Sequence, residues 1–448
     1  MPATSEEARL TAPIDRDEIL SYHLGGKVGL RLTKKLSDLR SLCTAYTPGV
    51  AVPVREIASD RSTLWKYTAK ANLVGVVSDG TAILGLGDLG AEASIPVMEG
   101  KAVLFKAFGD VDGWPVPLNF CRREGKNTGP TDPQRVIDAV CALSPMYGGI
   151  NLEDIAAPAC FEIEDRLEQL LDIPVFHDDQ WGTAVITLAA VKNYALLSDR
   201  KLPDLRIVIN GAGAAGIRIA EMLKASGAEA VTLCDTKGVV HRDRTDLNAK
   251  KREHAAGGTA RSLSEAIRGA HVFIGVSVAD CVKSEDVAAM ADYPAIYAMS
   301  NPDPEIRPEI VAETMGNRPY VMATGRSDYP NQVNNVLGFP FLFRGALDSG
   351  SRLINLQMKL AAANALADLA REPVPQQLLD LYPGMPDSLD RGYIIPKPFD
   401  RRLFIEVPHA VAAAAVASGA AARMDVEAYR LRLAERDHAR RWVLTPPS

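Results

Sequence analysis

The pattern of apolar and polar residues changes near residue 182, and this change predicts two kinds of folded unit. After it, apolar runs of strand length alternate with stretches of helical length. The runs lie at residues 207–209, 231–233, 272–274, 296–298 and 321–323. Short apolar runs separated by helices are typical of strand–helix–strand units on a parallel sheet. We therefore predict a doubly wound α/β sheet covered by helices.

The residues before 182 carry a mixed pattern. Residues 71–78 read as a strand, and residues 95–108 and 132–144 read as helices. Residues 120–130 contain Arg, Lys, Gly and Asn with little apolar content, which predicts an exposed loop. This part is expected to form a separate, mixed α/β domain.

The chain has 448 residues, which is too long for one ordinary hydrophobic core. Residues 182–197 form an apolar stretch that predicts a helix joining the two halves. The predicted domains are residues 1–181, residues 182–400 and a helical C-terminal extension at residues 401–448. The most apolar segment, residues 407–422, is too short to span a bilayer and predicts a buried or interfacial helix.

Composition and charge exclude several classes of protein. A net charge of −6 provides no electrostatic footprint for nucleic acid. The first 14 residues lack the basic and apolar regions of a secretory signal, so we expect a cytoplasmic protein. The six cysteines show no spacing typical of zinc or redox sites and are expected to be reduced. The pattern favours an enzyme or a binding protein that acts on small molecules.

A glycine-rich turn follows the first strand of the predicted sheet. Gly211, Gly213 and Gly216 have the GxGxxG spacing, directly between an apolar strand and a helix. The first glycine permits a tight turn, the second admits a pyrophosphate, and the third lets helix and strand pack closely. The intervening residues Ala212, Ala214 and Ala215 belong to the same turn. The spacing alone could be a structural turn, but its context predicts a dinucleotide site in a Rossmann-like domain.

Asp235 ends the next strand, about 24 residues after Gly211, where a carboxylate can bind the adenosine ribose. A carboxylate at this place favours NAD slightly over NADP, because it repels a 2′-phosphate. Three nearby cations, Lys237, Arg242 and Arg244, oppose that preference. The sequence therefore leaves both dinucleotides open.

Two acidic pairs, Glu153-Asp154 and Asp178-Asp179, stand directly beside apolar residues. Buried carboxylates must be paired or bound to a metal, and hard oxygen ligands suit Mg²⁺ or Mn²⁺. The alternative is that Glu153-Asp154 only stabilises the start of a helix.

Lys101 shares one helical face with Val97, Leu104 and Phe108, whereas Lys106 points elsewhere. Desolvation or a metal would lower the pKa of such a lysine toward the range of a general base. The alternative is a lysine whose stem packs while its head reaches solvent. Tyr46 lies in a turn with Pro48 and Gly49, where packing is the usual role of a tyrosine.

These segments together resemble the malic enzymes of the bacterial short type. The resemblance extends from about residue 20 to 410 and rests on eight motifs in the order of the family. The motifs are YTPGVA (46–51), SDGTAILGLGDLG (78–90), PVMEGKAVLFK (96–106), GINLEDI (149–155), PVFHDDQ (174–180), NGAGAAG (210–216), SNPDPE (300–305) and PNQVNNVLGFP (330–340).

The resemblance implies oxidative decarboxylation of (S)-malate to pyruvate and CO₂ with reduction of NAD⁺ or NADP⁺. Lys101 would be the general base, Asp178 would orient it, and Tyr46 would protonate C3 of enolpyruvate. Metal ligation would fall to Glu153, Asp154 and Asp179. The resemblance thus assigns three of the four acidic residues as ligands for Mg²⁺ or Mn²⁺ and the fourth as the partner of the base.

The family pattern also implies that Asn301 lies near the nicotinamide ribose and the substrate, and that Asn334 and Asn335 contact the substrate. A homodimer or higher homo-oligomer is expected from the family and from the apolar helix near the C-terminus. The expected ligands are small molecules, with neither nucleic acid nor membrane as a partner.

Three positions depart from the family pattern. Ala82 stands where longer members carry an arginine that grips malate. Trp181 stands where many bacterial members carry histidine and others carry glutamine. The loop at residues 119–131 is longer and more basic than is usual.

Two other functions are compatible with parts of this pattern. A malolactic-type enzyme would share the site but release lactate, because pyruvate would be reduced before leaving. A catalytically silent dinucleotide-binding regulator should have lost an acid–base group. Tyr46, Lys101 and Asp178 are all present, which argues against such a regulator.

Overall fold

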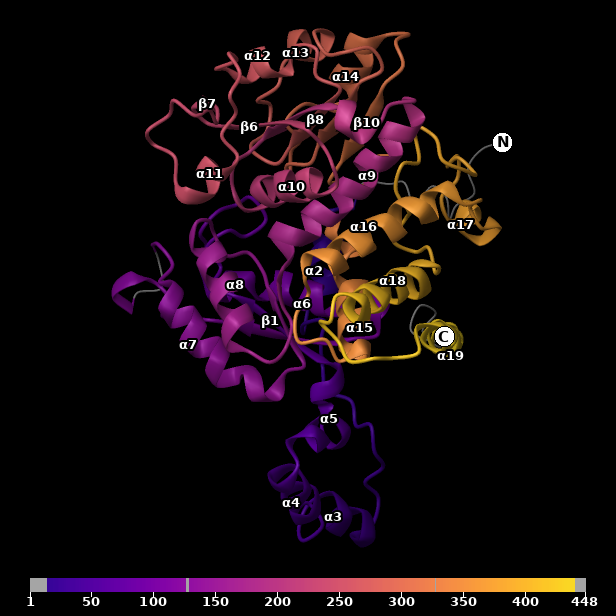
Figure 1. Ribbon diagram of the computed structural model, residues 1–448. Coiled ribbons are helices and arrows are strands. Elements are labelled where there is room, and N and C mark those ends of the chain that lie inside the picture. Colours follow the sequence, from indigo (N-terminus) through magenta and orange to yellow (C-terminus); the bar gives the residue numbers. More distant parts are fainter. Residues whose placement is uncertain (1–13, 126–128, 327, 440–448) are drawn as a thin grey trace.

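The computed structural model describes residues 14–125, 129–326 and 328–439. The chain forms two sheets, each flanked by helices. An extended arm near the N-terminus projects from the rest of the molecule (Figure 1). The α/β architecture predicted from the sequence is confirmed. Among the described residues, no helix combines the length and apolar character needed to cross a membrane.

The first sheet has four parallel strands in the order β2-β1-β3-β4. Its strands are β1 (Leu73–Ser78), β2 (Asp112–Pro117), β3 (Gly149–Leu152) and β4 (Val175–His177). Its helices are α6 (Ala91–Gly109), α7 (Pro133–Leu143) and α8 (Ala159–Leu170). The strand and the two helices predicted for this half are confirmed. Asp132, the last residue before α7, caps this helix by accepting a hydrogen bond from Gln134 N.

The second sheet has the order β10-β9-β8-β5-β6-β7 and is parallel except for the short β7. Its strands are β5 (Arg206–Asn210), β6 (Ala230–Asp235), β7 (Gly238–Val239), β8 (Val272–Gly275), β9 (Ala295–Ala298) and β10 (Val321–Thr324). All five predicted strands are confirmed. Strand order reverses between β5 and β8, and ligands of open α/β sheets bind at such a switch point.

Helices cover both faces of this second sheet (Figure 1). They are α9 (Thr183–Leu197), α10 (Ala214–Ala225), α11 (Ala249–Glu253), α12 (Leu263–Ile267), α13 (Ser284–Ala288) and α14 (Pro308–Met315). The predicted connecting helix is α9, which is apolar all round and almost wholly buried. A helix of this kind fits between other elements rather than at the surface.

The chain returns to the first domain through the first of its C-terminal helices, which packs on α6. They are α15 (Phe339–Ser349), α16 (Leu356–Arg371), α17 (Gln376–Leu381), α18 (Leu403–Ala417) and α19 (Val426–Ala439). Phe339 and Phe343 of α15 pack edge-to-face on Phe105 of α6, with ring centroids 4.7 and 5.2 Å apart. The predicted division at residue 400 stays a prediction, because helices on both sides of it cover the same core.

The apolar segment predicted at residues 407–422 is the greater part of α18, which ends at Ala417. Its apolar side is buried inside the chain, against α15 and α16. This helix therefore gives no support to the expected oligomer.

The predicted exposed loop at residues 120–130 is wrong in one part. Cys121 and Arg122 are buried, and Arg122 is only 1% exposed. The Arg122 guanidinium forms ion pairs with Asp79 and Asp88, at the loop that follows β1. A buried charge requires such partners, and no feature of the loop's own composition reveals them. Residues 126–128 lie outside the described ranges.

The arm comprises residues 28–69 and contains α3 (Leu39–Ala45), α4 (Ala51–Ser59) and α5 (Leu64–Tyr67). It follows α2 (Arg16–His23), and Lys27 fixes its start to α6 by donating to Pro96 O at 2.7 Å and to Glu99 Oε2 at 3.0 Å. The arm extends away from both sheets (Figure 1). No residue from 14 to 69 is buried.

Candidate active site

The two acidic pairs meet at the carboxyl end of the first sheet. Glu153 and Asp154 follow β3, and Asp178 and Asp179 follow β4. The strands are parallel neighbours, and Leu152 lies in register with His177. This register places the residues that follow each strand side by side. The segment after β4, Asp178–Gly182, is one turn of π-helix, a conformation found frequently at functional sites.

Three of these carboxylates could hold a metal ion. Oxygen atoms of Glu153, Asp154 and Asp179 lie within 4.8 Å of one another. The Asp154 amide also donates to Asp179 Oδ2 at 2.8 Å, which fixes the two loops together. Asp154 Oδ2 is buried without a hydrogen-bond partner. The donor set fits a hard divalent cation, which prefers carboxylate oxygens.

Burial and mutual repulsion raise the pKa of these carboxyl groups. Desolvation is the main cause for Asp154, and the Asp179 charge adds to it, so the pKa of Asp154 rises to about 8. Desolvation likewise raises the pKa of Glu153, and the neighbouring carboxylates add to that increase, whereas Lys101 opposes it. The carboxyl groups therefore need a positive charge in order to ionise together.

Lys101 provides one such charge from α6. Its Nζ lies 2.6 Å from Asp178 Oδ2 and 2.9 Å from Glu153 Oε1. Burial alone would lower the pKa of Lys101, but the carboxylates of Asp178, Glu153 and Asp179 outweigh it and raise the pKa. The prediction of a lowered pKa is therefore wrong for this arrangement of charges. The prediction that Lys101 faces inward while Lys106 does not is confirmed, since Lys106 pairs with Asp110.

Asp178 is held from a second direction by the segment after β10. The Asn335 amide donates to Asp178 Oδ2 at 3.1 Å and to the Asp178 carbonyl at 3.2 Å. Thr183 donates in turn to Asn335 Oδ1 at 3.2 Å. Asn334 caps the short helix η7 (Asn335–Leu337) by accepting from Val336 N. The structure thus places Asn335 against Asp178 and Asn334 in a cap, and their predicted substrate contacts stay predictions.

The glycine turn has the geometry that a dinucleotide requires. Gly211 has a φ of +123°, and a Cβ there would lie 2.3 Å from Val276 O at the end of β8. A Cβ on Gly216 would lie 1.7 Å from Gly211 O. A Cβ on Gly213, by contrast, would meet nothing within 4 Å, so this residue borders open space. Open space beside the N-terminus of α10 is where a pyrophosphate fits.

Asp235 is engaged by cations at the end of β6. Arg244 contacts both of its oxygens, at 2.8 and 3.0 Å, and Lys251 Nζ lies 2.7 Å from Asp235 Oδ2. Burial would raise the pKa of Asp235, but these hydrogen bonds lower it to about 2. The Asp235 carboxylate is therefore ionised and is not free of partners.

Comparison with known proteins agrees with this geometry. Residues 26–168 match the model for the malic enzyme N-terminal domain, and residues 181–391 match the model for the malic enzyme NAD binding domain. An NADP-dependent malic enzyme of Halomonas elongata is 50% identical over 413 residues, which cover 91% of this chain and 95% of that protein.

The chain belongs to the malic enzyme family. A probable NADP-dependent malic enzyme of Rickettsia prowazekii is 49% identical, but the match covers 94% of this chain and only 55% of that protein. The chain thus spans about half the length of some of the relatives it matches. The malic enzyme structure from Entamoeba histolytica superposes with a TM-score of 0.85 at 32% identity, covering 96% of this chain and 87% of that one.

Two residues that the malic enzyme motifs single out do not join the carboxylate cluster directly. Asn301 lies beyond β9 and is exposed, and its carbonyl approaches Gly85 of the first domain. That contact brings loops of both sheets together. Tyr46 is 68% exposed at the end of α3, in the arm that points away from the body. Within this single chain, Tyr46 is therefore not brought to Lys101.

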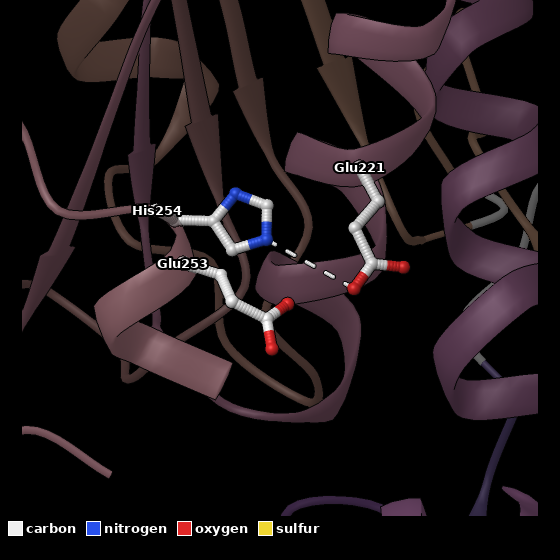
Figure 2. A group of neighbouring side chains, drawn as sticks. All are labelled: Glu221, Glu253 and His254. Atoms are coloured by element: carbon white, nitrogen blue, oxygen red, sulfur yellow. Dashed lines mark ion pairs between the residues drawn. The ribbon is translucent and has the colours of Figure 1, made fainter. Parts of the chain in front are cut away.

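A second group of potential ligands consists of Glu221, Glu253 and His254 (Figure 2). Lys224 Nζ lies 3.1 Å from His254 Nδ1, and Arg218 donates to both oxygens of Glu221. These cations already neutralise the carboxylate and occupy one ring nitrogen. The group is therefore an ion-pair cluster on α10 and α11.

A group of buried charged side chains next to the carboxylate cluster was not predicted from the sequence. Glu164 of α8, Arg218 of α10 and Lys359 of α16 gather around Trp181. They come from three helices that are far apart in sequence, so no local spacing indicates their contact. The only available signal was the departure from the family pattern at Trp181.

We expect two alanine substitutions in the glycine turn to have different effects. Gly213→Ala adds a methyl group to open space, so it should leave the free energy of unfolding unchanged while weakening dinucleotide binding about tenfold, or 1.4 kcal/mol. Gly216→Ala drives a methyl group into the Gly211 carbonyl and should cost about 1–3 kcal/mol of stability. Calorimetric titration and urea unfolding measure the two effects. Wild-type dinucleotide affinity in Gly213→Ala would show that the phosphates do not bind at this turn.

Proposed function

We propose that this chain oxidises and decarboxylates (S)-malate to pyruvate and CO₂ while reducing a nicotinamide dinucleotide. The observation that carries the proposal is the position of Lys101, with its Nζ between Asp178 and Glu153, beside a three-carboxylate cluster. A base next to a hard-cation site suits the deprotonation of a hydroxyl group beside a carboxylate. The family supports this chemistry.

Each side chain has a role in the proposed reaction. Lys101, as the neutral amine, takes the proton of the C2 hydroxyl as the hydride on C2 moves to the nicotinamide ring. Asp178 orients Lys101, and Asn335 fixes Asp178. After the carboxylate on C3 leaves as CO₂, Tyr46 donates a proton to C3, and the proton that Lys101 took from the hydroxyl replaces it on the Tyr46 phenolate. The products are pyruvate, CO₂ and the reduced dinucleotide.

Mg²⁺ or Mn²⁺ on Glu153, Asp154 and Asp179 would act as a Lewis acid on the C2 oxygen and would offset the negative charge that raises the pKa of Lys101. The buried and unpartnered Asp154 Oδ2 supports this assignment. The raised pKa values of the cluster support it too, since they show that one ammonium group does not balance these carboxylates.

We infer that NADP⁺ is preferred over NAD⁺. A slight preference for NAD followed from the sequence on the premise of a free Asp235 carboxylate. Ion pairs with Arg244 and Lys251 remove that premise, and Lys237, whose Nζ pairs with Asp246, lies beside them. Such a basic group suits a 2′-phosphate. Two relatives of about 50% identity are described as NADP-dependent.

Initial rates with malate, Mn²⁺ and either NADP⁺ or NAD⁺ test the proposal. We expect absorbance of the reduced dinucleotide to rise, faster with NADP⁺. Lys101→Ala should lower kcat by about a thousandfold, within the range that acid–base groups contribute, and leave dinucleotide binding unchanged. Lys106→Ala is the matched control, because Lys106 lies on the same helix but pairs with Asp110.

Wild-type rates in Lys101→Ala would remove Lys101 from the mechanism. Lactate that accumulates from malate without net reduced dinucleotide would identify the malolactic alternative instead.

We further infer that two copies of this chain assemble through the arm. Residues 28–69 expose many large apolar side chains and bury none. The exposed ones are Leu30, Leu32, Leu36, Leu39, Leu42, Tyr46, Val50, Val52, Val54, Trp65 and Tyr67. An apolar surface of this extent requires cover. A second copy of this chain would cover this surface. It would also bring its Tyr46 to the site of the first copy, which is not reached by the first copy's own Tyr46.

Mixing two inactive variants tests this arrangement. If Tyr46 serves the partner, a dimer of one Tyr46→Phe chain and one Lys101→Ala chain contains one intact site. Random mixing should then restore about a quarter of wild-type activity, since half of the dimers are mixed and each has one working site of two. The control mixes Tyr46→Phe with a chain that carries both Tyr46→Phe and Lys101→Ala. This mixture should restore no activity. No recovery in the first mixture would place Tyr46 and Lys101 of one chain in the same site.

A further inference from the structure

Trp181 lies under two cations that come from different parts of the chain. The Arg218 guanidinium carbon lies 4.4 Å from the centroid of the Trp181 ring, and Lys359 Nζ lies 3.6 Å from it. Trp181 Nε1 donates to Glu164 Oε2 at 3.0 Å. All four side chains are at least nine-tenths buried. Cation–π contacts are strongest when they are desolvated in this way, so the group is rigidly held.

On one side, this cluster includes the segment that carries the proposed metal ligand Asp179 and the lysine partner Asp178. Trp181 belongs to the turn Asp178–Gly182, two residues after the proposed metal ligand Asp179. Arg218 Nε donates to Gln180 Oε1 at 2.9 Å, so it holds the residue between them as well. Glu164 also accepts from the backbone of His177 at 2.8 Å, directly before Asp178. The segment that carries Asp178 and Asp179 is thus fixed from its outer side.

The other end of the cluster is the dinucleotide domain. Arg218 is the fifth residue of α10, about one turn from the glycine turn at its N-terminus. Its NH1 group donates to Glu221 Oε2 at 2.9 Å, and Glu221 faces His254 (Figure 2), with Oε1 3.9 Å from Nε2. His254 directly follows α11, whose Lys251 contacts Asp235. Arg218 is thus held by elements next to the predicted dinucleotide site.

We propose that Arg218 and Trp181 are positioning residues that couple the dinucleotide site to the metal site. A dinucleotide bound at the N-terminus of α10 restricts that helix, Arg218 transmits the restriction to Trp181 and Gln180, and the carboxylates of Asp178 and Asp179 are thereby held in place. Dinucleotide and divalent cation then strengthen each other's binding by the same factor, as linkage requires. This coupling rests on the proposed function, since it needs both ligands.

The experiment measures Mn²⁺ binding by calorimetry, without and with saturating NADP⁺, and involves no turnover. In the wild type, NADP⁺ should tighten Mn²⁺ binding about fivefold, at the lower end of typical coupling. Arg218→Lys keeps the positive charge but loses the planar guanidinium group, which donates to Gln180 and Glu221 at the same time. This variant should bind each ligand alone within about twofold of the wild type, with a coupling factor near one. A purely structural role would weaken both single affinities and leave the factor unchanged.

Two further proteins complete the test. Arg430→Lys is the matched control, because Arg430 pairs with Glu406 at the surface and should retain full coupling. Trp181→His introduces one of the two residues that the family pattern predicts at this position. It removes the indole and should also lose the coupling, and it replaces Arg218→Lys if that variant does not fold.

Wild-type protein that binds both ligands without coupling would overturn the link and leave the proposed function standing. Full coupling in Arg218→Lys or in Trp181→His would also overturn it. Failure of the wild type to bind either Mn²⁺ or NADP⁺ would overturn the proposed function and the link together.

Discussion

The burial of negative charge around Lys101 is the constraint on which the rest of the site depends. Four carboxyl groups stand at the ends of two adjacent parallel strands, and the one ammonium group of Lys101 lies 2.6 Å from Asp178 and 2.9 Å from Glu153. Desolvation raises the pKa of the acids, and the acids raise the pKa of the lysine. The arrangement retains its ionised form only while positive charge is close by. That requirement supports the proposal that a divalent cation binds beside Lys101.

The surrounding elements can be understood as support for this charge cluster. The parallel register of β3 and β4 brings the two acidic pairs together, and the π-helical turn after β4 presents Asp178 and Asp179 on neighbouring backbone positions. Helix α6 is anchored by phenylalanine packing against α15 and carries Lys101 inward. The second sheet contributes Asn335 from the segment after β10 and Arg218 from α10. Both sheets therefore hold the same few residues.

The sequence predicted the elements well because their signals are local. Strand-length apolar runs, the glycine turn and the inward face around Lys101 each depend on residues close together in the chain, and the structure contains them all. The acidic pairs and Lys101 stand out from the residue pattern alone, whereas the roles of Asp178, Tyr46 and the three asparagines rest on the family resemblance. All of these roles stay predictions. Contacts between distant segments were not predictable. Arg122 lies in a polar loop yet pairs with Asp79, and Trp181 gathers cations from α10 and α16. The exposure of Tyr46 in an arm likewise has no signature in its own motif.

The most direct test of the central claim is the pH dependence of Mn²⁺ binding without substrate. The pKa of Asp154 is raised to about 8, so below this pH the acid is protonated and must release its proton to bind the ion. Affinity should therefore rise up to about tenfold per pH unit between pH 6 and 8 and level off above. Proton release should be visible as a dependence of the calorimetric heat on the buffer. Asp179→Asn should weaken binding strongly. Affinity that is independent of pH, or unchanged by Asp179→Asn, would contradict the account.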